Sequence, residues 1–185
     1  MVKNIADKYL NPWQTISTRI VYENQWIRVR EDNVVRPDGA PGIYGVVEYY
    51  PCVGVLPIDA EGNVHLVGQH RYPLNCYSWE IPEGACNLNE APAMAARREL
   101  KEELGLKACK LEKLVSSHLS NSVSTEEAHI FLATELTQHE AEPEATEQLE
   151  RRIVSFATAL EMVRTGEITD SMSQLAILHY AALRR

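Results

Sequence analysis

The chain has 185 residues, 45% hydrophobic and 24% charged, which is enough for one domain with its own core. Its 26 acidic residues outnumber its 18 basic residues, and the net charge of −8 argues against a large nucleic-acid-binding surface. The four cysteines form no C-x-x-C pair, and the first residues lack the apolar core of a signal peptide. No stretch approaches the roughly 18 apolar residues of a membrane span. We therefore expect one domain over residues 1–185, with free thiols, in the cytoplasm.

The first part of the chain has the β-branched and aromatic content of strands, separated by turn residues. The turn Pro37-Asp38-Gly39 and the glycine-bearing loop at 59–63 join neighbouring strands, so we expect a meander followed by a hairpin. The predicted strands are 18–24, 26–32, 42–50, 52–58 and 64–72.

A helix is predicted from about Asn89, a good N-cap residue, to Gly105, which suits the left-handed position that ends many helices. Pro92 fits its first turn, where backbone N–H groups have no helical partner. The stripe that we expect to be buried consists of Ala93, Ala96, Leu100 and Leu104.

Three glutamates, Glu99, Glu102 and Glu103, lie in the last two turns of this helix at a spacing that puts them on neighbouring faces. Like charges at this spacing cost roughly 0.2–0.5 kcal/mol per pair, and a bound cation removes that cost. Oxygen-only ligands favour a hard ion such as Mg²⁺. In an arbitrary helix, however, the same residues would form a solvated acidic face.

The rest of the chain alternates between strands and helices, so the sequence predicts a sheet packed between helices, an α/β sandwich. The acidic segment 139–150 is interrupted by Pro143 and is predicted to be a loop. Ser171 and Gln174 fit a capping box at the start of the last helix. The predicted strands are 111–119, 127–136 and 151–156, and the predicted helices are 156–166 and 171–185.

The segment from Gly84 to Leu106, GACNLNEAPAMAARRELKEELGL, resembles a known family signature. Gly84 is followed after five residues by Glu90, and seven residues later come Arg98-Glu99-Leu100, Glu102-Glu103 and Gly105-Leu106. This is similar to the complete signature of the Nudix hydrolases, with no departure at any specified position. The resemblance implies an α/β/α sandwich with a mixed β-sheet. It also implies hydrolysis of a pyrophosphate bond with Mg²⁺ as the cofactor and Mn²⁺ as a substitute.

The same resemblance assigns roles to the signature residues. It implies that Glu99, Glu103 and the carbonyl of Ala85 are metal ligands, and that Glu102 is a further ligand or acts through water. Glu102 and Glu103 are therefore the catalytic candidates on the helix. The structural residues implied by the signature are Gly84, Glu90, Arg98 and Gly105.

Glu90 and Arg98 correspond to a family ion pair that holds the loop against the helix. An alternative for Arg98 is a contact with Glu102, one turn further along. Gly84 and Gly105 are interpreted as residues that the backbone conformation requires and that have no chemical role.

The run Trp79-Glu80-Ile81-Pro82-Glu83-Gly84 resembles the lead-in of ADP-ribose pyrophosphatases and related nucleoside diphosphate sugar hydrolases. In these enzymes the glutamate corresponding to Glu80 helps to bind metal or substrate, although an exposed carboxylate at a strand end is an alternative. Gln69-His70-Arg71 resembles their Q-x-R stretch, in which the arginine meets the pyrophosphate. A planar guanidinium suits this role because it can hold two oxygens at once.

Two further substrate-binding candidates lie outside the signature. Trp26 can stack on a base, although a tryptophan in the core is an alternative interpretation. Glu126 resembles a family position near the metal site.

The general base that activates water is expected in the acidic loop 140–150, as in enzymes similar to ADP-ribose pyrophosphatases. The register against the following strand favours Glu147, with Glu150 and Glu144 as alternatives. A base on the signature helix is a further alternative.

We therefore expect Mg²⁺-dependent hydrolysis of a nucleoside diphosphate sugar, with ADP-ribose as the leading candidate, to a nucleoside monophosphate and a sugar phosphate. Alternative substrates are nucleoside triphosphates, dinucleoside polyphosphates and capped RNA, and an alternative class is a non-catalytic nucleotide-binding module. Such modules typically lose signature glutamates, whereas this chain keeps all of them. Similar enzymes are often homodimers whose N-terminal strands cross, so the resemblance implies dimerisation through residues of about 16–50. We expect no nucleic-acid or membrane partner.

Overall fold

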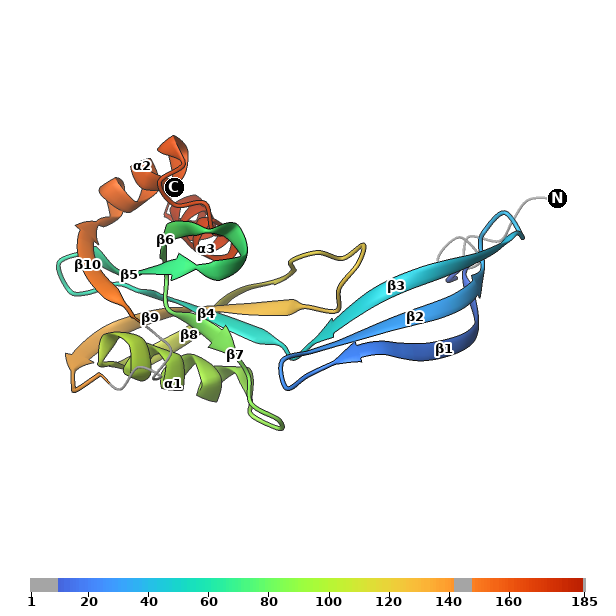
Figure 1. Ribbon diagram of the computed structural model, residues 1–185. Helices are drawn as coiled ribbons and strands as arrows, with labels where there is room; N and C mark the ends of the chain where they lie inside the picture. Colours follow the sequence, from blue (N-terminus) through green and yellow to red (C-terminus); the bar gives the residue numbers. More distant parts are fainter. Residues whose placement is uncertain (1–9, 142–147, 185) are drawn as a thin grey trace. The chain divides into compact units, whose positions relative to one another are not determined.

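The computed structural model describes residues 10–141 and 148–184 (Figure 1). The chain divides into two compact units. The first contains the described residues up to Tyr49 together with Ser120–Thr125, and the second contains Tyr50–Leu119 and the described residues from Glu126 onward.

The first unit is a three-stranded antiparallel sheet in the order β1-β2-β3, which is the predicted meander. Gly39, at a φ of 83°, allows the tight turn between the second and third strands. The segment Ser120–Thr125 is joined to this sheet by two hydrogen bonds at Val47: its N–H donates to Val123 O at 2.9 Å, and its carbonyl accepts from Thr125 N at 3.0 Å. The strands are β1 (Gln14–Glu23), β2 (Ile27–Val35) and β3 (Pro41–Tyr49).

The second unit contains two sheets. One is a mixed sheet in the order β7-β4-β9-β8, in which β4 and β9 are parallel and the other pairs are antiparallel. The other is antiparallel, in the order β10-β5-β6. The strands are β4 (Cys52–Pro57), β5 (Asn63–Arg71), β6 (Cys76–Glu80), β7 (Glu83–Ala85), β8 (Leu106–His118), β9 (Glu127–Gln138) and β10 (Glu150–Ser155).

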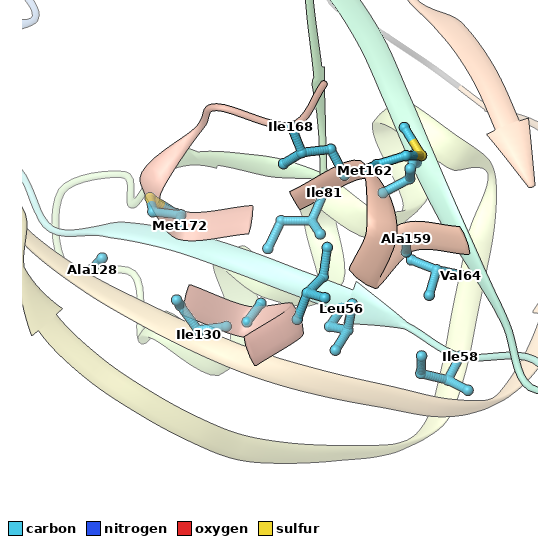
Figure 2. Close-up of a cluster of buried hydrophobic side chains, with 13 residues drawn as sticks. Leu56, Ile58, Val64, Ile81, Ala128, Ile130, Ala159, Met162, Ile168 and Met172 are labelled. Carbon is cyan, nitrogen blue, oxygen red and sulfur yellow. The ribbon is translucent and has the colours of Figure 1, made fainter. Parts of the chain in front are cut away.

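Helices cover both faces of the mixed sheet (Figure 1). Val53 and Val55 of β4 belong to one hydrophobic cluster with Leu100 of α1. Leu56 belongs to a second cluster with Met172 of α3 (Figure 2). Because both faces are covered, β4 is a nearly continuous buried run. The predicted α/β/α sandwich with a mixed sheet is confirmed. The helices are α1 (Pro92–Leu104), α2 (Phe156–Thr165) and α3 (Ser171–Leu183).

The predicted start of α1 is wrong by two residues. Its N-cap residue is Ala91, and Asn89 instead adopts a left-handed conformation with φ of 64° in the preceding loop. Within the predicted stripe Ala93 is exposed, and Ala95 is buried in its place. Helical periodicity gives the angle of a side chain about the axis but not how far the covering sheet extends along it. The helix ends at Gly105 in the predicted left-handed conformation, with φ of 67°.

The predicted cap of α3 is displaced by one residue. The N-cap residue is Asp170, whose Oδ2 accepts a hydrogen bond from Ser173 N at 2.6 Å, and not Ser171. Gln174 does not complete a capping box, because its Nε2 donates to Ile168 O at 2.9 Å. Aspartate and serine are both good caps, so two neighbouring candidates compete and the sequence does not separate them.

All four cysteines are free, as predicted. In the described part of the chain, no helix combines the length and the apolar character needed to cross a membrane.

Candidate functional site

The site is built around two acidic side chains of α1 that are almost completely buried. The exposed fractions of Glu99 and Glu103 are 7% and 1%, which is unusual for carboxylates. Glu99 fits against β7 because Gly84 has no side chain there: a Cβ on Gly84 would overlap the Glu99 carboxylate. The predicted ligand carbonyl, that of Ala85, belongs to the next residue of the same strand.

Arg98 connects this helix to the preceding loop. Its Nε and Nη2 donate to the two carboxylate oxygens of Glu90 at 3.1 and 2.9 Å, so the predicted ion pair is present. Its Nη1 also donates to Glu102 Oε2 at 3.0 Å, so the alternative contact exists as well. The bonds with Glu90 raise the pKa of Arg98 and lower the pKa of Glu90.

Arg98 also contacts two of the three ligands that the signature resemblance assigns to a metal, Glu99 and the carbonyl of Ala85. Its Nη1 donates to Glu99 Oε1 at 2.6 Å, and its Nη2 donates to Ala85 O at 2.9 Å. One guanidinium therefore fixes the side chain of Glu99 and the carbonyl of Ala85 close to each other, because its planar fork offers several N–H donors in a fixed geometry.

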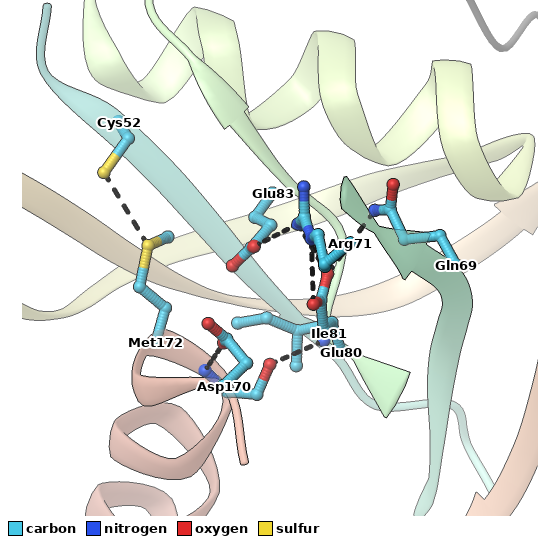
Figure 3. A network of polar contacts seen from close by, with 9 residues as sticks. Cys52, Gln69, Arg71, Glu80, Ile81, Glu83, Asp170 and Met172 are labelled. Carbon is cyan, nitrogen blue, oxygen red and sulfur yellow. Dashed lines mark hydrogen bonds and ion pairs between the residues drawn. The ribbon is translucent and has the colours of Figure 1, made fainter. Parts of the chain in front are cut away.

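A second charged cluster joins the ends of β5, β6 and β7 (Figure 3). Arg71 Nε donates to the two oxygens of Glu80 at 3.0 and 3.1 Å, and its Nη2 donates to Glu83 Oε1 at 2.5 Å. Gln69 Nε2 donates to Glu80 Oε2 at 3.4 Å. The two residues of the predicted Q-x-R stretch therefore converge on the predicted glutamate.

Negative charge is concentrated around Glu83. Burial raises the pKa of Glu83 well above its ordinary value, and the carboxylates of Asp170, Glu80 and Glu103 raise it further, against the opposing effect of Arg71. Glu83 Oε2 is buried and has no hydrogen-bond partner among the described residues. A buried, unsatisfied carboxylate oxygen is costly, so this cluster is suited to a positively charged or hydrogen-bond-donating ligand.

A cavity of about 170 Å³ opens beside Arg71. Asp170, the N-cap residue of α3, lies on its wall. The same end of α3 contacts the acidic cluster through Ser173, whose Oγ accepts a hydrogen bond from Ile81 N at 2.9 Å (Figure 3). The cavity is lined by Arg71, Pro73, Leu74, Ser78, Glu80, Thr169 and Asp170.

The donor set fits a hard divalent cation, because it consists of carboxylate and carbonyl oxygens. The carboxylates gathered around Glu83 and the unsatisfied oxygen of Glu83 both favour the binding of a cation. As arranged within residues 10–141 and 148–184, however, no three or more Asp, Glu, His or Cys side chains form a ready metal centre. Glu99 is turned toward Arg98 in this structure.

The remaining sequence-predicted residues lie in different places. Glu126 precedes β9, and burial raises its pKa. Burial, together with the charges of Glu126 and Glu83, raises the pKa of Cys52 to about 12. Trp26 belongs to the first unit and is 67% exposed, so the alternative of a core tryptophan is wrong. Glu147 and its alternative Glu144 lie outside the described residues.

Three residues with clear structural roles at this site were not predicted: Glu83, Asp170 and Ser173. Glu83 is within the lead-in to the signature, next to Gly84, and its position beside the loop glycine was the available signal. Asp170 is a good cap residue before a predicted helix. Nothing local to Ser173 indicates its partner, because Ile81 is 92 residues away in the sequence.

Comparisons with known proteins agree with this geometry. Residues 48–171 match the family model of the NUDIX domain, and residues 13–47 match that of the nucleoside diphosphate sugar hydrolase N-terminal domain. The chain is 32% identical to an ADP-ribose pyrophosphatase of Bacillus subtilis over 166 residues, covering 89% of this chain and 90% of that protein. It is 31% identical to an ADP-ribose pyrophosphatase of Mycobacterium tuberculosis over 170 residues, covering 90% and 82%.

The fold is also similar to a solved structure described as an ADP compounds hydrolase. The TM-score is 0.84 at 19% identity, over 94% of this chain and 95% of that one. The complete signature, the architecture and the family match over two thirds of the sequence lead to one conclusion: this chain is an enzyme of the Nudix hydrolase family.

Proposed function

We propose that this enzyme hydrolyses the pyrophosphate bond of a nucleoside diphosphate sugar, with ADP-ribose as the leading substrate, to a nucleoside monophosphate and a sugar phosphate. The observation that carries the proposal is the convergence of two clusters on β7. In one, α1 places Glu99 beside Gly84 and Arg98 on the carbonyl of Ala85, and in the other, Arg71 pairs with Glu83. The similarity to two ADP-ribose pyrophosphatases supports the choice of substrate.

Nudix hydrolases generally use divalent metal ions, and Glu99, Glu103 and the carbonyl of Ala85 are the residues that would hold Mg²⁺, or Mn²⁺ in its place. The ion would neutralise the diphosphate and lower the pKa of the attacking water. Glu99 Oε1 and the carbonyl of Ala85 accept hydrogen bonds from Arg98, and each group has further lone pairs that an ion would use. Glu102, which also contacts Arg98, would act as a further ligand or through water.

Arg71 is the proposed phosphate-binding residue. Its guanidinium is 35% exposed and already oriented by Glu80 and Glu83, so little side-chain freedom is lost when it meets an anion. The cavity beside it is lined by the Asp170 carboxylate and the Ser78 hydroxyl. The carboxylate can accept hydrogen bonds from the hydroxyl groups of a sugar, and the hydroxyl can accept or donate them.

We place the catalytic base in the acidic segment before β10, and Glu147 is the proposed residue. Its alternative Glu150 lies at the start of β10 and accepts a hydrogen bond from Tyr77 Oη at 2.9 Å, which engages one of its oxygens. Trp26 is the proposed base-stacking residue, Glu126 a proposed substrate contact, and the cytoplasm the proposed location.

The test is phosphate release, coupled through a phosphatase, from ADP-ribose, other nucleoside diphosphate sugars, nucleoside triphosphates and dinucleoside polyphosphates. Each substrate is assayed with Mg²⁺ and with a chelator, beside Glu103→Gln and Arg71→Lys. We expect metal-dependent turnover of diphosphate sugars, a loss of at least 100-fold in Glu103→Gln, and a higher KM in Arg71→Lys, because lysine keeps the charge but not the fork.

Three other outcomes are informative. Preference for triphosphates or dinucleotides would keep the chemistry and overturn the substrate assignment. Full activity in the chelator would overturn the metal assignment. Silence on every substrate, with a measured affinity for nucleotides, would favour a binding module over an enzyme of this specificity.

A further inference from the structure

A second cavity lies on the flank of α1 that faces away from the acidic residues. It has a volume of about 380 Å³ and lies between α1, the beginning of β8 and the end of β9. This volume is within the range of about 300–1,000 Å³ that is typical of small-molecule sites. The cavity, called the Arg97 pocket below, is lined by Arg97, Lys101, Lys107, Ala108, Cys109 and Thr137.

The Arg97 pocket is separate from the proposed catalytic site. Arg97 and Lys101 are four residues apart on α1 and share a face. Glu99 is two residues from both and Glu103 is two residues after Lys101, and a step of two residues turns about 200° around the axis. The two cavities have no lining residue in common.

The pocket is strongly cationic in a chain whose net charge is −8. Half of its six lining residues are Arg or Lys, and no acidic residue lines it within the described part of the chain. Arg97 and Lys107 form no ion pair among the described residues. The contrast with the next residue in sequence is direct, because Arg98 is engaged by the carboxylates of Glu90, Glu99 and Glu102.

Arg97 is also held in place. Its Nη1 donates to the carbonyl of Ala108 at 2.6 Å, a neutral acceptor that fixes the guanidinium without neutralising it. A guanidinium has five N–H donors, so this bond leaves others for a ligand. Thr137 lies on β9, which pairs with β8, and its Oγ1 donates to the carbonyl of Lys107 at 3.4 Å. Lys107 is the lysine of β8 that lines the pocket.

From these observations we propose that the Arg97 pocket is a second binding site for a small phosphorylated molecule, of the size of a nucleoside monophosphate or a sugar phosphate. A phosphate monoester carries a charge of about −1.5 to −2 at neutral pH, which Arg97 and Lys107 together oppose, and its oxygens suit the arginine fork. The rest of the cavity accommodates the body of the molecule. Such a ligand would bind without a metal ion.

The test uses the whole chain in a chelator, so that binding to a metal-loaded catalytic site does not contribute. The probes are AMP, ribose 5-phosphate and inorganic phosphate, with adenosine and ribose as uncharged controls, and affinity is measured by titration calorimetry. We expect at least one phosphorylated probe to bind and the uncharged probes not to bind. The double variant Arg97→Gln/Lys107→Gln should weaken this binding at least tenfold.

A matched control removes the same amount of charge from β8, the strand that carries Lys107. Lys110 and Lys113 are exposed on β8 outside the pocket, so Lys110→Gln/Lys113→Gln should leave the affinity within a factor of two. Equal weakening in the two double variants would mean that only the general charge of the surface matters, and it would overturn the proposal.

The cysteines provide a second readout that needs no variant. Cys109 and Cys76 are both exposed, but only Cys109 lines the pocket. Alkylation with a neutral reagent, followed by mass spectrometry, should show that the bound probe slows the modification of Cys109 and leaves Cys76 unchanged. Unprotected Cys109 at a saturating concentration of the probe would overturn the proposal, as would the failure of every phosphorylated probe to bind.

Discussion

Gly84 leaves room for the Glu99 carboxylate, because a Cβ at this position would overlap it. We therefore expect Gly84→Ala to displace Glu99 and to weaken Mn²⁺ binding and turnover at least tenfold. Overpacking of this kind also costs about 1–3 kcal/mol of stability. Calorimetric titration with Mn²⁺, a thermal unfolding curve and the turnover assay measure the three effects.

The control for this substitution is Gly45→Ala, because a Cβ on Gly45 has no atom within 4 Å. This variant should bind Mn²⁺ and turn over substrate as the wild type does. If Gly84→Ala also retained wild-type Mn²⁺ affinity, the carboxylate of Glu99 would not be a ligand that depends on its contact with β7.

Asp59, in the loop between β4 and β5, links stability to pH. Burial by itself raises the pKa of Asp59, but bonds from the backbone and side chain of Asn63 and the contact with His65 outweigh burial and lower it. A lowered folded-state pKa gives stability that is present above the unfolded value of about 3.9 and is lost as the pH falls through the folded value.

Asp59→Asn should therefore be less stable than the wild type at pH 7, and the difference should narrow below about pH 4, where the wild-type carboxyl takes up its proton. Urea unfolding of both proteins at several pH values measures this difference, and effects of other acidic groups cancel in it. A difference that stayed constant down to pH 3 would show that the stability comes from packing and not from the charge.

The N-terminal turn of α3 supports the site through Ser173. Ser173 is completely buried and accepts the N–H of Ile81, which lies between Glu80 and Glu83 in the chain. Ser173→Ala leaves that N–H buried without an acceptor, at a cost of about 1–3 kcal/mol. Because the connection between β6 and β7, which joins Glu80 to Glu83, loses its anchor, we also expect kcat/KM to fall at least fivefold.

The comparison variant is Ser155→Ala, which removes the N-cap bond of α2, in which Ser155 Oγ accepts from Thr158 N at 3.1 Å. Its loss should cost about 1 kcal/mol and leave kcat/KM unchanged, since α2 contributes no residue to the site. Thermal unfolding and steady-state kinetics separate the two variants. A similar loss of kcat/KM in both would mean that activity follows stability and that Ser173 has no positioning role.

Local sequence signals account for the three helices and most of the strands of the described residues, but not for the short strands β6 and β7. They also account for the acid face of α1, because helical spacing alone brings Glu99 and Glu103 together. They locate a helix end well at Gly105, where only one residue suits the left-handed position. They fail at Asn89, a good cap that the loop uses in another conformation.

The parts of the site that the sequence did not predict depend on pairs that are distant along the chain. Arg71 meets Glu83 across 12 residues, and Ser173 meets Ile81 across 92 residues. Such pairs arise from strand order and from the packing of α3 on the mixed sheet, which no local pattern encodes. The family resemblance predicts binding roles for Arg71 and Glu80, but it does not predict that these two side chains contact each other.

At the scale of the whole molecule, the first unit leaves many large apolar side chains exposed. Its strand β1 is exposed at every position. Contiguous exposed apolar surface in a folded protein commonly marks an interaction surface. The resemblance to dimeric enzymes makes a second copy of this chain the proposed partner. The most exposed of these residues are Leu10, Ile16, Tyr22, Trp26 and Ile43, each more than half exposed, with Ile20 at 49%.

We therefore expect the wild type to sediment as a homodimer, at about twice the monomer mass of 20.9 kDa. Ile20→Asp places a charge on β1, and desolvating that charge in an interface is costly, so this variant should sediment mainly as a monomer at micromolar concentration. Ile153→Asp is the matched control, because Ile153 is 59% exposed on β10 in the second unit and should leave the dimer intact. A monomeric wild type, or a dimer disrupted by Ile153→Asp and not by Ile20→Asp, would contradict association through the first unit.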